Sequence, residues 1–271
     1  MKLSDVGELG LLGELERRGL ARGIEHDAAA LGGGLVVTQD ALVESVHFRL
    51  GAISWRDLGF RAAAVNLSDL AASGATPEAL VVTLAAPAET ELDDVLELYE
   101  GIAEPGAPVV GGDTTSAPQL VLSVTALGRS ERVPGRAGAR PGDLLVVTGP
   151  LGAAGAAFRE DRYVRPPIRL EEGRRLARTA HAMLDVSDGL ARDAAHIAGR
   201  SGVRVVIDLD RVPLAPGAVV ADLGFGEDFE LLAAVPDAAG FAEIGRCEEG
   251  EGVELVFEGR PVELPSYEHF R

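Results

Sequence analysis

Residues 55–77 of the chain read WRDLGFRAAAVNLSDLAASGATP. Residues 55–73 are rich in alanine and repeat their apolar side chains at helical spacing, which predicts a helix. The run Gly74-Ala75-Thr76-Pro77 ends that helix. One carboxylate, Asp69, lies within this apolar stretch. A carboxylate in apolar surroundings is costly to bury unless a positive group compensates it.

Strands and a second helix are predicted around this helix. The first six of these elements have the order β-β-α-β-α-β, which is typical of a ferredoxin-like half. The first two strands flank a turn at Asp40, which places His47 on a strand, facing away from Val46 and Phe48. The predicted strands cover residues 35–39, 45–49, 80–85, 109–110 and 120–127, and the second helix covers 91–104.

A segment rich in arginine, glycine and proline, residues 129–142, separates this half from a second α/β unit. We therefore expect an α/β fold of the α+β type in two domains, residues 1–135 and 136–271. The second unit is predicted to contain strands over 144–148, 183–185, 203–207, 229–235, near 244 and over 253–257, and helices near 151–160, 169–181 and 189–199.

The composition excludes several classes of protein. At 271 residues the chain exceeds the usual size of one domain, and its 46% hydrophobic content supports sizeable cores. The net charge of −18 argues against an extended surface for nucleic acid or an anionic membrane. No stretch is long and apolar enough to span a membrane, and residues 1–5 show no signal-peptide pattern, so we expect a cytoplasmic protein.

Two residue counts limit the possible chemistry further. Lys2 is the single lysine, so a P-loop and a protein-kinase fold, which both need an internal lysine, are excluded. Cys247 is the single cysteine, which excludes an intrachain disulfide framework and a multi-cysteine zinc site. Any phosphate would have to be bound by metal ions, arginines and backbone amides.

Six short acidic motifs are set in small or apolar residues along the chain. Each alone could be a turn or a helix cap. If they met in one cleft, their carboxylates would repel one another unless cations lay between them, and hard oxygen ligands suit Mg²⁺. The pattern therefore indicates a phosphate-handling site with several metal ions. The motifs are His26-Asp27-Ala28-Ala29, Gln39-Asp40, Asn66-Leu67-Ser68-Asp69, Gly111-Gly112-Asp113-Thr114-Thr115, Asp185-Val186-Ser187-Asp188-Gly189 and Gly226-Glu227-Asp228.

The order of these motifs resembles that of the thiamine-monophosphate kinases, a family in the superfamily of aminoimidazole ribonucleotide synthetase and selenophosphate synthetase. The resemblance runs from Asp27 to the closing residues 266–270. It implies direct transfer of the γ-phosphoryl group of ATP to thiamine monophosphate, which makes thiamine diphosphate. It also implies a homodimer in which the first domains pair their sheets. The most specific motifs are DALVESVHF from Asp40, NLSDLAASGA from Asn66, GGDTT from Gly111, DVSDGL from Asp185 and GEDFELL from Gly226.

The resemblance further implies which residues act. The first domain would bind ATP and Mg²⁺, and the second would complete the active site. The positions for several Mg²⁺ ions are Asp27, Thr38, Gln39, Asp40, Asp69, Asp113, Asp185 and Asp188. The ATP contacts are Tyr99, Gly112, Asp113, Arg136 and Ser187, and the contacts to thiamine monophosphate are His47, Glu227 and Tyr267. No residue is assigned as a general acid or base.

Two positions depart from the family pattern: His26 stands where an acidic residue is usual, and Gln39 replaces a commoner threonine. Two alternatives therefore stay open. One is another ATP-dependent enzyme of the superfamily. The other is a catalytically silent nucleotide-binding relative.

Overall fold

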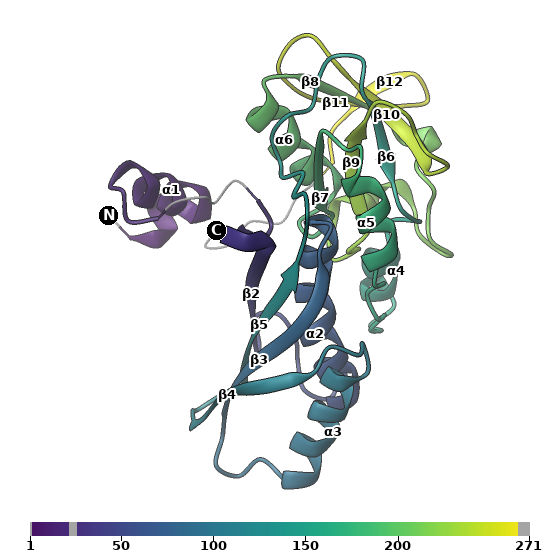
Figure 1. Ribbon diagram of the computed structural model, residues 1–271. Coiled ribbons are helices and arrows are strands. Elements are labelled where there is room, and N and C mark those ends of the chain that lie inside the picture. The colour runs from purple at the N-terminus through teal and green to yellow at the C-terminus, as the bar shows by residue number, and fades with distance from the viewer. Residues whose placement is uncertain (1, 22–25, 265–271) are drawn as a thin grey trace.

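The computed structural model describes residues 2–21 and 26–264 (Figure 1). Two sheets with helices packed against them form two α/β units, which confirms the predicted fold class. The first sheet has the strand order β1-β2-β5-β3-β4, and the second has the order β12-β11-β8-β10-β6-β9-β7. In the part of the chain that the structure describes, no helix has the length and apolarity needed to cross a membrane.

The first unit packs helices α2 and α3 against one face of its sheet, while α1 stands apart from both sheets (Figure 1). Strands β3 and β4 pair in parallel, and β5 pairs antiparallel with both β2 and β3. The elements are α1 (Leu3–Arg17), β1 (Ala29–Ala30), η1 (Gly32–Gly34), β2 (Leu35–Val43), α2 (Trp55–Ala72), β3 (Thr76–Ala86), α3 (Leu92–Ala103), β4 (Val109–Ser116) and β5 (Val121–Arg129).

The two helices approach so closely that their backbones touch. A Cβ atom added at Gly59 would lie 1.9 Å from the carbonyl oxygen of Leu98, and one added at Gly101 would lie 2.0 Å from that of Arg56. No other residue type fits at either crossing point. The core beneath them joins the fully buried leucines Leu58, Leu67, Leu70, Leu80 and Leu122.

The predicted turn at Asp40 and the predicted strand 45–49 are wrong. Strand β2 continues through Asp40, which pairs with Val124 in an unbroken register with β5. The backbone N–H of Asp40 donates to Oδ1 of Asn66 at 3.1 Å, so a helix side chain stabilises the polar residue inside the strand. The chain turns only afterwards, where the backbone N–H of His47 donates to the carbonyl of Val43 at 2.9 Å. His47 therefore lies in a turn.

Strand β4 is longer than the sequence predicts. The prediction ends the strand at Val110, but the pairing with β3 continues through Gly111 and Gly112 to Ser116. A Cβ atom at Gly112 would lie 1.8 Å from the carbonyl oxygen of Val82. Glycine here therefore permits close strand contact, where the sequence suggested a loop.

The second unit has the predicted elements and two additions, β12 and short 3₁₀ turns. Residues 130–143 contain no helix or strand. Strands β8 and β11 pair in parallel. The elements are β6 (Leu144–Val147), α4 (Ala153–Arg159), α5 (Leu170–Ala177), β7 (Ala182–Asp185), α6 (Leu190–Ser201), β8 (Arg204–Asp208), η2 (Leu209–Arg211), η3 (Val220–Gly224), β9 (Leu231–Val235), β10 (Ala242–Glu248), β11 (Gly252–Phe257) and β12 (Arg260–Val262).

Helix α2 connects the two units. Its Ser68 donates to Oδ2 of Asp185 at the end of β7 at 2.5 Å. Helix α5 packs against it so closely that a Cβ atom at Gly173 would lie 2.2 Å from the carbonyl oxygen of Ala71. The helix that the alanine-rich stretch predicts is therefore shared by both cores.

Candidate active site

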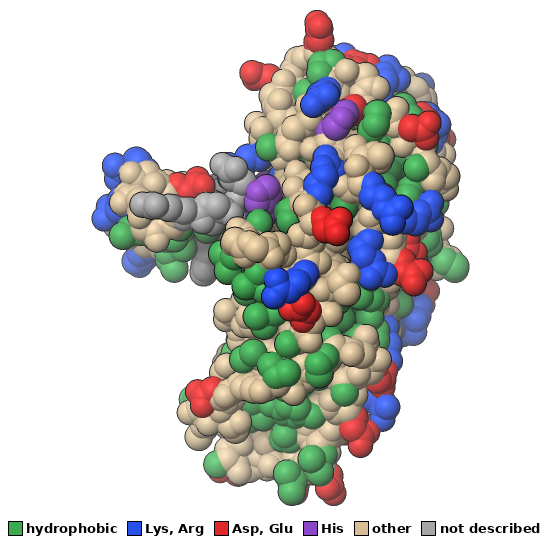
Figure 2. All heavy atoms as spheres, viewed as in Figure 1, with side chains coloured by type: hydrophobic (Ala, Val, Ile, Leu, Met, Phe, Trp, Pro, Cys, Tyr) green, Lys and Arg blue, Asp and Glu red, His purple; other side chains and the backbone are tan. Residues whose placement is uncertain are grey.

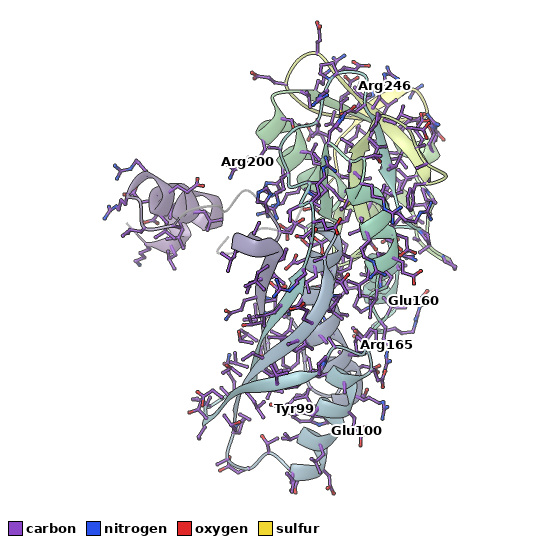
Figure 3. All side chains as sticks on the ribbon, viewed as in Figure 1. Tyr99, Glu100, Glu160, Arg165, Arg200 and Arg246 are labelled. Carbon is purple, nitrogen blue, oxygen red and sulfur yellow. The ribbon has the colours of Figure 1, made fainter. Side chains whose placement is uncertain are left out.

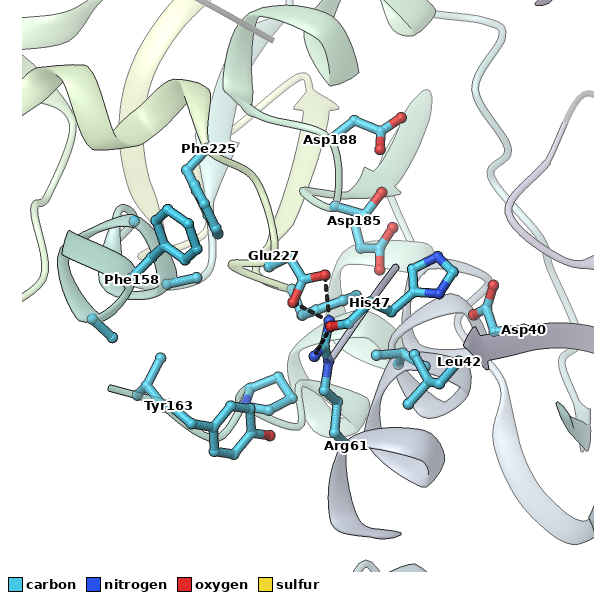
Figure 4. A pocket seen from close by; sticks show the side chains of 18 of the residues that line it. Asp40, Leu42, His47, Arg61, Phe158, Tyr163, Asp185, Asp188, Phe225 and Glu227 are labelled. Atoms are coloured by element: carbon cyan, nitrogen blue, oxygen red, sulfur yellow. Dashed lines mark hydrogen bonds and ion pairs between the residues drawn. The ribbon is translucent and has the colours of Figure 1, made fainter. Parts of the chain in front are cut away.

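A cavity of about 1050 Å³ lies where the two units meet (Figure 4). The first unit contributes β2, the turn at His47 and one face of α2. The second unit contributes the segment after β7, helix α4, residues 162–166 and the loop around Glu227. Eleven predicted site residues line this cavity: Asp27, Thr38, Gln39, Asp40, His47, Asp69, Arg136, Asp185, Ser187, Asp188 and Glu227.

Three carboxylates meet at one end of the cavity. Each of Asp27, Asp69 and Asp185 offers an oxygen atom, and these atoms lie within 4.8 Å of one another. The hydroxyl of Thr38 on β2 donates to Oδ2 of Asp69 at 2.5 Å. Asp27 comes from the segment before β1, Asp69 from α2 and Asp185 from β7, so three separate parts of the chain form this acidic cluster.

The carboxylates of this cluster repel one another, so cations would stabilise their ionised forms. Burial, together with the negative charges of Asp185, Asp40 and Asp27, raises the pKa of Asp69 well above its usual value. Burial and the charge of Asp27 raise the pKa of Asp185 to about 8. Burial, and then the charge of Asp27, also raises the pKa of Asp40. A set of oxygen donors that resists ionisation without compensating charge fits Mg²⁺.

Arg136 is the nearest counter-charge to this cluster. Its Nε donates to Oδ1 of Asp27 at 2.8 Å, and its Nη2 lies 2.6 Å from the same oxygen. Burial raises the pKa of Asp27, and the guanidinium of Arg136 opposes that shift. One guanidinium thus faces three clustered carboxylates, so the negative charge is only partly compensated.

A second group of possible metal ligands includes Asp188, the one member of it that lines the cavity. Oxygen or nitrogen atoms of Asp188, Asp193 and His196 lie within 4.8 Å of one another. The backbone N–H of Asp188 donates to Oδ2 of Asp193 at 3.0 Å, and Nε of Arg192 lies 3.3 Å from Oδ2 of Asp188. Asp188 is therefore held by its own loop and by α6.

The raised pKa of Asp185 leads to a prediction about stability. An unfolded aspartate ionises at about pH 4, whereas native Asp185 keeps its proton up to about pH 8. The native state therefore binds more protons than the unfolded state in this window, and its free energy of unfolding falls as the pH rises through it. Without divalent cations, we expect the melting temperature to fall by several degrees between about pH 5 and pH 8.

Adding Mg²⁺ should reduce this fall, because cations then compensate the ionised carboxylates and stabilise the native state. Melting curves in EDTA and in magnesium chloride test both statements, with potassium chloride of equal ionic strength as the control. A melting temperature that stays constant with pH in EDTA would contradict the prediction.

From the acidic cluster the cavity continues past His47 and Glu227 towards an aromatic wall (Figure 4). The Nδ1 atom of His47 accepts the backbone N–H of Val43 at 2.9 Å, so its proton in the neutral ring lies on Nε2. Nη2 of Arg61 donates to both carboxylate oxygens of Glu227, at 2.5 and 2.6 Å. Figure 4 shows this contact at the centre of the cavity.

An aromatic pair forms the outer wall. The rings of Phe158 and Phe225 lie 4.9 Å apart between centroids, although Phe158 is 64% exposed and Phe225 36% exposed. Nε and Nη2 of Arg159 on α4 donate to Asp222 on η3 at 2.8 and 2.6 Å, which fixes the two elements that carry the rings. The cavity therefore has an acidic end and an aromatic end.

Several predicted site residues lie elsewhere. Gly112 and Asp113 are exposed on the edge strand β4, and Asp113 accepts a hydrogen bond from the backbone N–H of Thr114 at 2.9 Å. Tyr99 packs on α3 against the first core (Figure 3). The motif of Asp113 therefore does not meet those of Asp27, Asp40 and Asp69 in this cavity within one chain. Tyr267 lies outside the described residues.

Gln39 lines the cavity, but its side chain points to the opposite face of the sheet from those of Thr38 and Asp40. Its side-chain Nε2 donates to the hydroxyl of Ser123 on β5 at 2.9 Å. Thr38 and Asp40 alternate with it along β2 and therefore point to the other face of the sheet. The Gln39 side chain is thus engaged in the sheet, and its backbone carbonyl is the group left to face a cation.

Comparison with known proteins supports the same interpretation of the sequence. Residues 25–130 match the model of the AIR synthase related protein N-terminal domain, and residues 140–256 match that of the C-terminal domain. The chain is 32% identical to the thiamine-monophosphate kinase of Aquifex aeolicus, with all of both chains covered. It belongs to the thiamine-monophosphate kinase family.

Further members of the family agree in sequence and in structure. The thiamine-monophosphate kinase of Methanopyrus kandleri is 36% identical over 86% of this chain and 85% of its own length. A solved structure, AaThiL complexed with AMPPCP and TMP, superposes with a TM-score of 0.91 at 32% identity and covers 99% of each chain. Both units therefore have the arrangement seen in the family.

Among the cavity-lining residues that sequence analysis missed are the buried arginine Arg61 and the aromatic residues Phe158, Tyr163 and Phe225. One signal was available for Arg61. It lies eight residues before Asp69 on α2, so helical periodicity places both on the same face. No pattern indicated the aromatic residues, because they come from separate elements that only the fold brings together.

Proposed function

We propose that the protein transfers the γ-phosphoryl group of ATP to thiamine monophosphate and so makes thiamine diphosphate. One observation carries this proposal: a single cavity joins the acidic cluster of Asp27, Asp69 and Asp185 to the end that holds His47 and Glu227. The acidic end suits a metal-held polyphosphate. The other end suits a ring-bearing acceptor, because it offers aromatic faces and hydrogen-bonding groups.

The metal-binding residues in this proposal are Asp27, Thr38, Gln39, Asp40, Asp69, Asp113, Asp185 and Asp188. Bound Mg²⁺ would neutralise the charge of two phosphate groups that have to approach each other. Arg136 adds a guanidinium beside Asp27, where it can also reach phosphate oxygens. Ser187 also lines the cavity and is proposed as an ATP contact.

Tyr99, Gly112 and Asp113 remain proposed ATP contacts, although they lie outside this cavity. That role would require a homodimer in which the first-unit sheets pair. Along β5, Val121, Ser123, Thr125 and Leu127 lie on the face that α2 and α3 leave open, and they are only half-buried. Figure 2 shows hydrophobic side chains gathered over this face. A dimer that pairs these sheets would cover the face and carry β4 towards the partner.

The proposed division into domains follows from these roles. Residues 1–135 would supply most ATP and Mg²⁺ ligands, and residues 136–271 would complete the site with Asp185, Ser187, Asp188 and Glu227. The contribution of both units to one cavity supports this division.

Formation of ADP, measured with and without thiamine monophosphate and Mg²⁺, tests the proposed function. We expect ADP and thiamine diphosphate in equal amounts only when both are present. ADP formed with a different phosphorylated acceptor would favour another enzyme of the superfamily. Binding of ATP without turnover on any acceptor would favour a silent relative.

Replacement of Arg136 by lysine tests the proposed nucleotide contact. Lysine keeps the charge but loses the planar fork that bonds two oxygens at once, so we expect the KM for ATP to rise about five- to tenfold. Arg140→Lys is the matched control, because Arg140 is an exposed arginine of the same segment. Equal KM values for ATP in the two variants would contradict the role of Arg136.

A further inference from the structure

A charged side chain is buried under the acceptor end of the cavity. Arg61 lies in the middle of α2 and is only 6% exposed. Its Nη1 donates to the backbone carbonyl of His47 at 2.7 Å, and its Nη2 donates to the Glu227 carboxylate. A buried guanidinium is costly unless it is paired, so these contacts are needed for it to stay there.

The partner of Arg61 belongs to the second unit. Glu227 follows it by 166 positions and has a left-handed backbone with φ of 59°. This conformation is unfavourable for a residue with a Cβ atom and persists only where the surroundings hold it. The backbone N–H of Glu227 donates to the carbonyl of Ser187 at 2.8 Å. Arg61 therefore holds a strained loop that also packs against the metal end.

Helix α2 sets the distance between the two ends of the cavity. Arg61, Val65 and Asp69 are spaced by four residues, lie on one face and all line the cavity. Eight residues of helix span about 12 Å. One rigid element thus carries both a proposed metal ligand and the residue that fixes His47 and Glu227.

We propose that Arg61 is a positioning residue that joins His47 and Glu227 into one acceptor-binding unit, at a distance from the acidic cluster that α2 determines. This inference rests on the proposed function and adds how the site selects an acceptor. Because Arg61 neutralises Glu227, the carboxylate acts through its position and hydrogen bonding, and the planar ring of the acceptor is recognised by the aromatic wall.

Two buried polar atoms beside this unit point to a ligand. Nε of Arg61 and the hydroxyl of Tyr163 have no hydrogen-bond partner among the described residues, and both side chains line the cavity. A buried donor without a partner costs about 1–3 kcal/mol. Both atoms are closed to solvent, so a hydrogen-bond acceptor on a molecule in the cavity would satisfy them only after a small shift of these side chains.

A second ion pair provides a matched control. Arg169 is partly buried and donates from Nε and Nη2 to the two oxygens of the buried Glu230 at 2.7 and 2.6 Å. Neither of these two residues lines the cavity. Arg169→Gln therefore removes a comparable contact without touching the proposed acceptor unit.

The test is steady-state kinetics of the full-length protein with ATP and thiamine monophosphate. We expect Arg61→Gln to raise the KM for thiamine monophosphate at least about tenfold, because bonds to charged groups are lost, while the KM for ATP changes less than about twofold. Glu227→Gln should act similarly. The KM of the double variant for thiamine monophosphate should exceed that of the more impaired single variant by no more than about twofold, since the pair acts as a unit.

Arg169→Gln should lower the melting temperature and leave the KM for thiamine monophosphate unchanged. An unchanged KM for that acceptor in Arg61→Gln, or equal changes for both substrates, would overturn the inference. If Arg61→Gln does not fold, the KM values of Arg61→Lys provide the same test, because lysine keeps the charge but loses one contact. Failure of the wild-type protein to phosphorylate thiamine monophosphate would refute the proposed function, which is a separate result.

Discussion

Replacement of Asp69 by asparagine is expected to lower kcat/KM for thiamine monophosphate by about a thousandfold or more, with the fold retained. The side chain keeps its size but loses the charge that would hold Mg²⁺. Its oxygen can still accept the hydroxyl of Thr38, so the local contact survives. The loss should therefore be one of metal binding, measured as ADP formation over a range of Mg²⁺ concentrations.

The same substitution should stabilise the protein when no divalent cation is present. Asp69 lies among three other carboxylates that raise its pKa, so ionising it in the native state is unfavourable. Asparagine cannot ionise and removes that repulsion. At about pH 8 in EDTA, where the wild-type cluster is forced towards ionisation, the variant should have the higher melting temperature.

Asp93→Asn is the matched control, because Asp93 is exposed in the first turn of α3 and far from the cavity. It should change neither turnover nor Mg²⁺ dependence. Full activity of Asp69→Asn would show that the metal site has been placed wrongly. A loss of both activity and thermal stability would point to a structural role instead.

Local sequence was informative where one element carries its own signal. Helix α2 was predictable because its alanines, its leucines and the Gly74–Pro77 stop all agree. Asp69 and Asp185 were identified as ligand candidates because a carboxylate among apolar residues is costly to bury unless a positive group compensates it. Their meeting within 4.8 Å is the outcome that the motifs implied.

Contacts between distant segments were not predictable. Asp40 suggested a turn, but β2 continues through it, and its backbone N–H donates to the side chain of Asn66, 26 positions later. Asp113 was grouped with the other carboxylates by its motif, yet the strand order puts β4 at the sheet edge, with β5 and β3 between it and β2. The role of Arg61 depends on Glu227, which lies 166 positions away in the sequence and contacts it only in the folded structure.

Selectivity for the acceptor should be the largest effect of all. Thiamine monophosphate should be phosphorylated efficiently, and unphosphorylated thiamine should be used at least about a thousandfold less well. The acceptor's phosphate oxygen is already ionised and can attack directly. A hydroxyl would first have to lose a proton, which requires a general base near it.

The geometry of His47 argues against such a base. Its Nδ1 accepts the backbone N–H of Val43, so the nitrogen that could take a proton is occupied, and Nε2 already carries one. The carboxylates at the acidic end are the proposed metal ligands. Two other carboxylates line the cavity, but Glu227 is paired with Arg61 and Asp222 with Arg159. The site therefore fits an acceptor that arrives ionised.

Label in the γ-phosphate of ATP should consequently appear in thiamine diphosphate without passing through the protein, because an ionised acceptor needs no covalent intermediate to react. The reaction can be quenched during the first turnover and the protein separated from the nucleotides. Labelled protein that passes its phosphate to thiamine monophosphate would refute direct transfer. Efficient phosphorylation of thiamine would instead refute the acceptor assignment, because it would require a base that His47, with its Nδ1 engaged by Val43, does not provide.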